Sequence, residues 1–144
     1  MNMLFPNKSS CHKNQKKIIS QESGNRHVVD NPYQIEVYQY HVDGDIIPKD
    51  DTSSERCDYI VEASKQLKPI AFIIELKGSD LLKAINQIEA TISRYKQQLA
   101  NYGIYPRIVC RRITTIASKD TKLIRFRQKY PHTKYAARTL TDTI

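Results

Sequence analysis

Three charged residues in the middle of the chain have the types and spacing that phosphate chemistry requires. Asp58 begins the apolar segment 57–63, and Glu75 and Lys77 end the apolar segment 69–77. Two carboxylates that converge on one point can hold Mg²⁺, which fills its other positions with water and phosphate oxygens. The backbone carbonyl of Leu76 could supply one more oxygen. Such a metal polarises a phosphate and activates water, while an ammonium group stabilises the developing charge.

The elements that position these residues are two strands, 57–63 and 69–77, which form an antiparallel hairpin. Pairing Ala63 with Ile70 places Asp58 directly opposite Glu75, whereas a slip of one residue would send Asp58 to the other face. Alternation along the strand puts Glu75 and Lys77 on one face. The alternative is a simple ion pair between Glu75 and Lys77 at a strand end, in which case Asp58 and Glu75 would point apart.

The remaining segments predict a mixed α/β order with no internal repeat, in a single domain of residues 1–144. Gly24 is interpreted as the C-terminal cap of the first helix. The period of the apolar residues changes from two to about 3.5 at Ser79, which indicates a long helix. We expect a loose segment 1–12, helices at 13–23, 79–102 and 120–130, and further strands at 34–42, 105–113 and 133–138.

The net charge of +8 is unevenly distributed along the chain. Residues 31–80 carry ten acidic and five basic residues, whereas residues 81–144 carry thirteen basic and three acidic ones. This arrangement suits a metal-centred site that acts on a polyanion, although solvated faces can also differ in sign by chance.

Composition also limits the class of protein. No apolar run approaches the roughly 20 residues that cross a bilayer, so no membrane partner is expected. The three cysteines show no CxxC spacing, and no export signal is visible, so the expected location is the cytoplasm.

The order Asp58, Glu75-Leu76-Lys77, Gly78 and then a helix resembles the core of the PD-(D/E)xK nuclease superfamily, and the likeness covers residues 34–113. It implies a restriction-endonuclease-like α/β fold, whose central mixed sheet contains a three-stranded meander flanked by helices. It also implies that Asp58 and Glu75 bind Mg²⁺, which Mn²⁺ can replace, and that Lys77 is catalytic. Cys57 stands where the proline of the family's name would be.

Further residues around this core are candidates for the site. Many members of this family carry a glutamine on the helix after the lysine, and Gln87 is the candidate, although Thr91 stands where a subset has tyrosine. Members often add a glutamate from the first helix, for which Glu22 is the candidate metal ligand. The N–H groups at Gly78 and Ser79, where the long helix starts, could receive a phosphate. The basic candidates for contacts with nucleic acid are Arg107, Arg111, Arg112, Lys122 and Arg125.

The sequence therefore predicts a Mg²⁺-dependent nuclease that hydrolyses phosphodiester bonds, in DNA rather than RNA. The alternative is a non-catalytic module that keeps the fold and binds nucleic acid or another protein. Because 144 residues leave little room for a specificity domain, we expect low specificity, a homodimer or a targeting partner.

Overall fold

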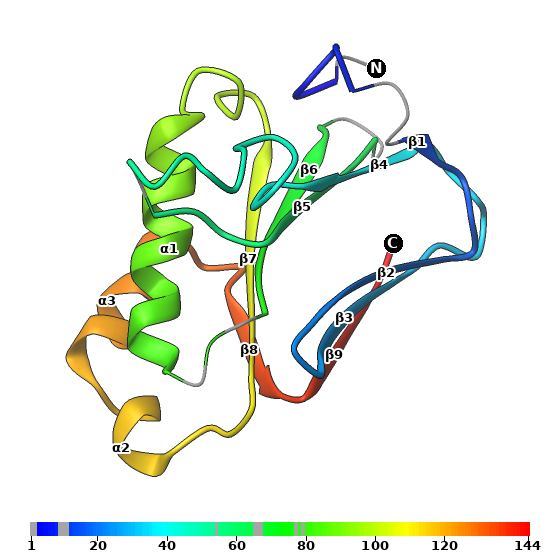
Figure 1. Ribbon diagram of the computed structural model, residues 1–144. Coiled ribbons are helices and arrows are strands. Elements are labelled where there is room, and N and C mark those ends of the chain that lie inside the picture. The colour runs from blue at the N-terminus through cyan, green and yellow to red at the C-terminus, as the bar shows by residue number, and fades with distance from the viewer. Residues whose placement is uncertain (1–2, 9–11, 54, 65–67, 77, 79) are drawn as a thin grey trace.

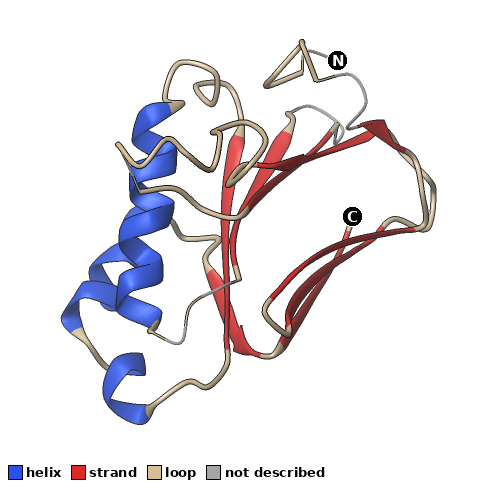
Figure 2. Ribbon diagram, in the orientation of Figure 1, coloured by secondary structure: helices blue, strands red, loops and turns tan. Residues whose placement is uncertain are grey.

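A computed structural model describes residues 3–8, 12–53, 55–64, 68–76, 78 and 80–144. Helices α1 and α3 cover one face of a six-stranded sheet, and a three-stranded sheet covers the other face (Figures 1 and 2). The helices are α1 (Leu81–Arg94), α2 (Thr115–Ser118) and α3 (Thr121–Lys129). The strands are β1 (His12–Lys13), β2 (Lys17–Glu22), β3 (Asn25–Asp30), β4 (Val37–His41), β5 (Tyr59–Ala63), β6 (Ile70–Glu75), β7 (Gly103–Cys110), β8 (Lys134–Ala137) and β9 (Thr139–Thr143).

The six-stranded sheet has the order β1-β4-β5-β6-β7-β8. Strands β4, β5 and β6 form an antiparallel meander, and β7 and β8 are added in parallel after helical crossovers. The predicted mixed sheet with a three-stranded meander is therefore confirmed. Strand β6 lies inside the sheet with all six residues buried, as its continuous apolar sequence requires.

The smaller sheet comes largely from a segment whose structure the sequence analysis predicted wrongly. Residues 13–23 do not form a helix, because β2 occupies Lys17–Glu22 and alternates buried Ile18 and Ser20 with exposed neighbours. Gly24 does not cap a helix either. Ser23 and Gly24 have φ values of 52° and 81°, which suit a two-residue hairpin turn between β2 and β3.

Strands β1 to β4 form one long, bent hairpin that joins the two sheets (Figure 1). The open end of the hairpin, where β1 pairs with β4, belongs to the large sheet. The end at the turn, where β2 pairs with β3, belongs to the small sheet. Strand β9 completes the small sheet parallel to β3. Neither β3 nor β9 was predicted, and the same holds for the short elements β1 and α2.

Helix α1 begins later and ends earlier than predicted. Asp80 is its N-cap, and the helix ends at Arg94. The apolar residues of the longer predicted helix are nevertheless buried, since Tyr95, Leu99 and Tyr102 lie in the core from the turns that follow α1. Helix α3 and strands β7 and β8 lie close to the predicted ranges. In the part of the chain that the structure describes, no helix is long and apolar enough to span a bilayer.

The large sheet has a separate apolar cluster on each face. One cluster joins Ile60, Ile73 and Ile108 of the sheet to Ile85 of α1 and Phe126 of α3. The other joins alternate residues of the same strands to the small sheet. The two faces of β5, β6 and β7 are thereby buried against different layers.

A buried charged cluster connects the small sheet to β7. Arg107 of β7 donates from Nε and Nη2 to the Asp142 carboxylate of β9 at 2.7 and 3.0 Å. His27 Nε2 of β3 lies 2.8 Å from the same carboxylate. Burial lowers the pKa of His27 below 6.5, and the bond to Asp142 offsets this only in part. Burial would raise the pKa of Asp142, but its hydrogen bonds from His27 and Arg107 lower it.

This cluster predicts a loss of stability in mild acid. Unfolded His27 binds a proton near its ordinary pKa of 6.5, whereas the folded residue does so only at lower pH, so stability declines as the pH falls below 6.5. One such proton changes the free energy of unfolding by at most about 1.4 kcal/mol per pH unit. The free energy of unfolding in urea should differ less between pH 7.5 and pH 5.5 for His27→Gln than for the wild type. Equal differences would contradict this role of His27.

Candidate metal centre

The predicted register of the β5–β6 hairpin is confirmed, from the pair Ala63 and Ile70 to the pair Tyr59 and Ile74. Beyond the last pair, the N–H of Asp58 donates to the carbonyl of Ile74 at 3.0 Å. The N–H of Leu76 donates to the Asp58 carboxylate at 2.7 Å. A side-chain oxygen thus replaces the backbone acceptor that would continue the ladder, and the hairpin ends at Asp58.

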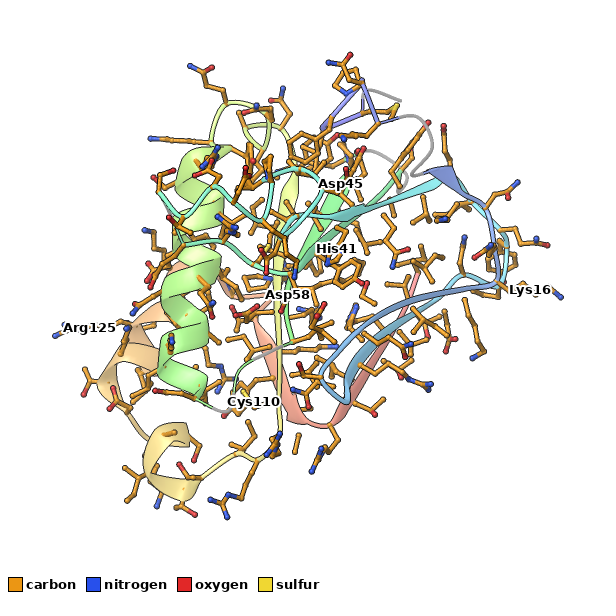
Figure 3. The ribbon with its side chains drawn as sticks, viewed as in Figure 1. Lys16, His41, Asp45, Asp58, Cys110 and Arg125 are labelled. Atoms are coloured by element: carbon orange, nitrogen blue, oxygen red, sulfur yellow. The ribbon has the colours of Figure 1, made fainter. Side chains whose placement is uncertain are left out.

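Asp58 directly precedes β5 and Glu75 is the last residue of β6, so both acids belong to this end of the hairpin. Figure 3 shows Asp58 between α1 and the small sheet. Each residue is only 1% exposed. Alternation along β6 places Glu75 on the face of Ile73, which is the helix-covered face. Burial raises the pKa of the Cys57 thiol, and the charges of Glu75 and Asp58 both raise it further. Both carboxylates therefore lie close enough to Cys57 to raise the pKa of its thiol.

The tip of the β2–β3 hairpin reaches the same strand ends from the opposite layer. Asn25, the first residue of β3, is 3% exposed, and its Nδ2 donates to the backbone carbonyl of Leu76. Leu76 therefore bonds Asp58 through its N–H and Asn25 through its carbonyl. The carbonyl that was predicted as a metal ligand is already the acceptor of an amide.

Glu22 also reaches this region, but from the end of a strand and not from the predicted helix. Its Oε2 lies 3.6 Å from Nε2 of His41, whose ring stacks on Tyr59 with the ring centroids 4.6 Å apart. Burial raises the pKa of Tyr59, and the charges of Glu22 and Asp58 raise it further. Glu22 thus lies within electrostatic reach of the residue that follows Asp58.

The start of α1 was predicted to receive a phosphate through the N–H groups of Gly78 and Ser79. Lys77 and Ser79 lie outside the described residues. The carbonyl of Gly78 accepts a hydrogen bond from the N–H of Arg111 at 3.4 Å. Two N–H groups in the first turn of the helix, those of Leu82 and Lys83, donate to the Asp80 carboxylate at 2.9 and 3.3 Å. A negative side chain occupies these donors, so they are not available for a phosphate.

Gln87 lies on α1 and is half-buried, and no hydrogen bond between described residues connects its side chain to either carboxylate. Its backbone carbonyl accepts a hydrogen bond at 2.9 Å from Thr91 Oγ1, which itself accepts the N–H of Cys57 at 2.8 Å. Thr91 therefore attaches α1 to the residue before Asp58.

The predicted contacts with nucleic acid separate into buried and exposed residues. Arg107 is 2% exposed and bonded to Asp142, so its prediction as a surface contact does not fit the structure. Arg111, Arg112 and Arg125 are exposed. Lys122 is half-buried, and its Nζ donates to the side-chain oxygen of Asn86 on α1.

A groove between α1 and α3 gathers further basic side chains. It consists of two cavities of about 310 and 430 Å³ that share Glu89 and Lys129. Glu89 is the one acidic residue among the described residues that line it. The basic residues of the lining are Lys96, Lys122, Arg125 and Lys129. The groove lies on the outer side of α1, away from the residues that pack on the sheet.

Asn25 is the residue near the carboxylates that the sequence analysis missed. It contacts Leu76 across 51 positions of sequence, through a hairpin whose turn was interpreted as a helix cap. The adjacent Ser23-Gly24 pair was the available signal, since this composition also suits a two-residue hairpin turn.

Among the described residues, no group of three or more His, Cys, Asp or Glu side chains is placed to hold a metal ion. Comparison with known proteins finds no matching family model, curated protein or solved structure. The resemblance to the PD-(D/E)xK superfamily therefore rests on the residues of this chain and their placement.

The contact between Thr91 and Cys57 predicts a measurable contribution to stability. Thr91→Val keeps the shape of the side chain but leaves the buried Cys57 N–H without its acceptor, which should cost about 1–3 kcal/mol. Thr91→Ser retains the hydroxyl and should lose less. The free energies of unfolding in urea test this comparison, and an unchanged value for Thr91→Val would show that the bond does not hold α1 to β5.

Proposed function

We propose that this protein is a metal-dependent nuclease that hydrolyses phosphodiester bonds in DNA. The observation that supports the proposal most strongly is the confirmed β5–β6 register, which leaves Asp58 directly before β5 and Glu75 as the last residue of β6 at one end of the hairpin. The order of meander, helix α1 and parallel strand β7 also agrees with a restriction-endonuclease-like core. A strand in place of the expected first helix is a departure from that core.

The donor chemistry of the site fits Mg²⁺, with Mn²⁺ as a substitute. Asp58 and Glu75 offer carboxylate oxygens, which such hard cations prefer. They would hold the ion, with Glu22 as a further candidate ligand from the hairpin tip. When bound, the metal would polarise the phosphate and activate a water molecule.

The other proposed roles belong to residues around the two carboxylates. Lys77 stabilises the charge that develops on the phosphate, and Gln87 of α1 positions groups at the site. The apolar surroundings of the carboxylates, including Cys57 and Cys110, exclude bulk water and strengthen electrostatic interactions. Both thiols are free, which suits the reducing cytoplasm that we propose as its location.

The proposed partner is nucleic acid because the helical layer carries a large excess of positive charge. Residues 81–130 contain eleven basic and two acidic residues, and Arg107 is the buried one among the basic residues. The groove between α1 and α3 places Lys122, Arg125 and Lys129 along one helix at spacings of three and four residues, which is one face of α3. A regular polyanion such as a DNA backbone matches this row of charges. A homodimer or a separate targeting protein would supply specificity.

One observation favours the alternative of a non-catalytic nucleic-acid-binding module. Asp58 and Glu75 are each 1% exposed, and Asn25 already bonds the Leu76 carbonyl. A phosphate can reach the carboxylates only if a covering segment moves aside. A binding module would use the basic helical layer alone and would keep the two acids as structural groups.

The two functions differ in their response to Asp58→Asn. This variant keeps an oxygen that can accept the Leu76 N–H but removes the negative charge that a cation needs. We expect Mg²⁺-dependent cleavage of plasmid DNA to fall by at least about a hundredfold, since one such group commonly supplies several kcal/mol to a metal-assisted reaction. Lys77→Ala should have a similar effect.

The matched control for that experiment is Asp50→Asn, because Asp50 is an exposed acid far from β6 in the loop before β5. It should cleave as the wild type does. DNA affinity should be nearly unchanged in all three variants. Retained cleavage by Asp58→Asn would refute the proposed mechanism, and absence of cleavage by the wild type with intact DNA binding would favour the binding module.

The basic groove predicts the salt dependence of DNA binding. Changing Lys122, Arg125 and Lys129 together to Gln should weaken duplex binding and reduce the slope of log K against log salt by about 0.9 for each phosphate that the protein no longer neutralises. Changing Lys13, Lys16 and Lys17 to Gln removes the same charge at the opposite side of the molecule, as Lys16 and Arg125 in Figure 3 show, and serves as the control. Equal effects of the two triple variants on affinity and slope would contradict a role for the groove.

A further inference from the structure

The side-chain oxygen of Asn25 is a buried acceptor that lacks a hydrogen-bond donor within the described residues. The other amide atom of the same side chain, Nδ2, donates to the Leu76 carbonyl. An unsatisfied buried polar atom costs about 1–3 kcal/mol, so a native structure normally gives it a partner. The orphaned atom indicates that Asn25 has a partner outside the described residues.

The position of this oxygen is fixed by two anchors. Ser23 and Gly24, both with positive φ, form the tight turn that pairs Glu22 with Asn25. The bond to Leu76 then holds the amide at the end of β6. Because the oxygen and Nδ2 are attached to one carbon atom, Oδ1 lies next to the Leu76 carbonyl and cannot move away without breaking that bond.

Leu76 also connects Asn25 to the two carboxylates. Its N–H bonds Asp58 at 2.7 Å, and the residue before it is Glu75. Asn25 of β3 and Asp58, just before β5, thus bond the backbone of Leu76, and Glu75 of β6 is its neighbour in the chain. Asn25, Asp58 and Glu75 each come from a different segment of the sequence.

We propose that Asn25 Oδ1 is a third protein ligand of the divalent cation held by Asp58 and Glu75. A neutral amide oxygen is a common ligand of Mg²⁺ and related cations, and it adds an oxygen without adding a third buried negative charge. The small sheet thereby contributes to the chemistry of a site whose other ligands lie on the large sheet. This inference rests on the proposed function, because it assigns a role toward the same cation.

The test is the affinity of the full chain for Mn²⁺, measured by electron paramagnetic resonance without any nucleic acid. Asn25→Ala should weaken Mn²⁺ binding by about tenfold or more, which is the scale for residues that support a metal site. Asn25→Asp should bind Mn²⁺ at least as tightly as the wild type, because it supplies a charged oxygen at the same position.

Asn31 provides a matched control in the same hairpin. It is also fully buried, but both of its amide atoms are bonded, Nδ2 to the carbonyls of Gln15 and Ile35 and Oδ1 to the N–H of Ile35. Asn31→Ala should therefore lower stability without changing the affinity for Mn²⁺. Folding of every variant is checked by circular dichroism.

Two outcomes would overturn the proposal, and they are distinguishable. If the wild type binds Mn²⁺ and Asn25→Ala binds it equally well, Asn25 is not a ligand while the proposed metal centre stands. If the wild type binds no Mn²⁺, the proposed function fails together with this inference. If Asn25→Ala does not fold, the result for Asn25→Asp decides. The aspartate cannot donate to the Leu76 carbonyl, so if Asn25 had only a structural role, this variant would gain no affinity for the cation.

Discussion

The backbone of Leu76 carries the two hydrogen bonds on which the arrangement of the site depends. Its N–H is bound by the Asp58 carboxylate, which ends the β5–β6 ladder, and its carbonyl is bound by Asn25 from the small sheet. These two bonds bring three strands from both sheets to one residue.

The distribution of charge follows from the same architecture. The acidic side chains Asp58 and Glu75 lie inside, where a low dielectric makes each of them costly without a compensating partner. Most basic side chains of residues 81–130 lie on the outer surface of the helical layer. Arg107 is the exception, because it neutralises Asp142 between the sheets and so stabilises the fold. The protein thus keeps an acidic interior behind a basic surface.

The sequence predicted the elements whose signals are local. The apolar run of β6 and the pairing of Ala63 with Ile70 predicted the register of the β5–β6 hairpin, and the 3.5-residue period identified the core of α1. Interactions between distant segments could not be predicted in this way. Residues 17–22 form β2 by pairing with β3 in the small sheet, and the local sequence did not reveal this pairing. Arg107 resembled a surface residue because its partner, Asp142, is 35 positions away.

The most direct test of the central claim is a crystal of the full chain soaked in Mn²⁺, with the cation located by its anomalous scattering. The account predicts one strong peak about 2–2.5 Å from carboxylate oxygens of both Asp58 and Glu75, the range expected for oxygen ligands of such cations. A peak elsewhere, or continuous density for the two carboxylates with no cation between them, would contradict it.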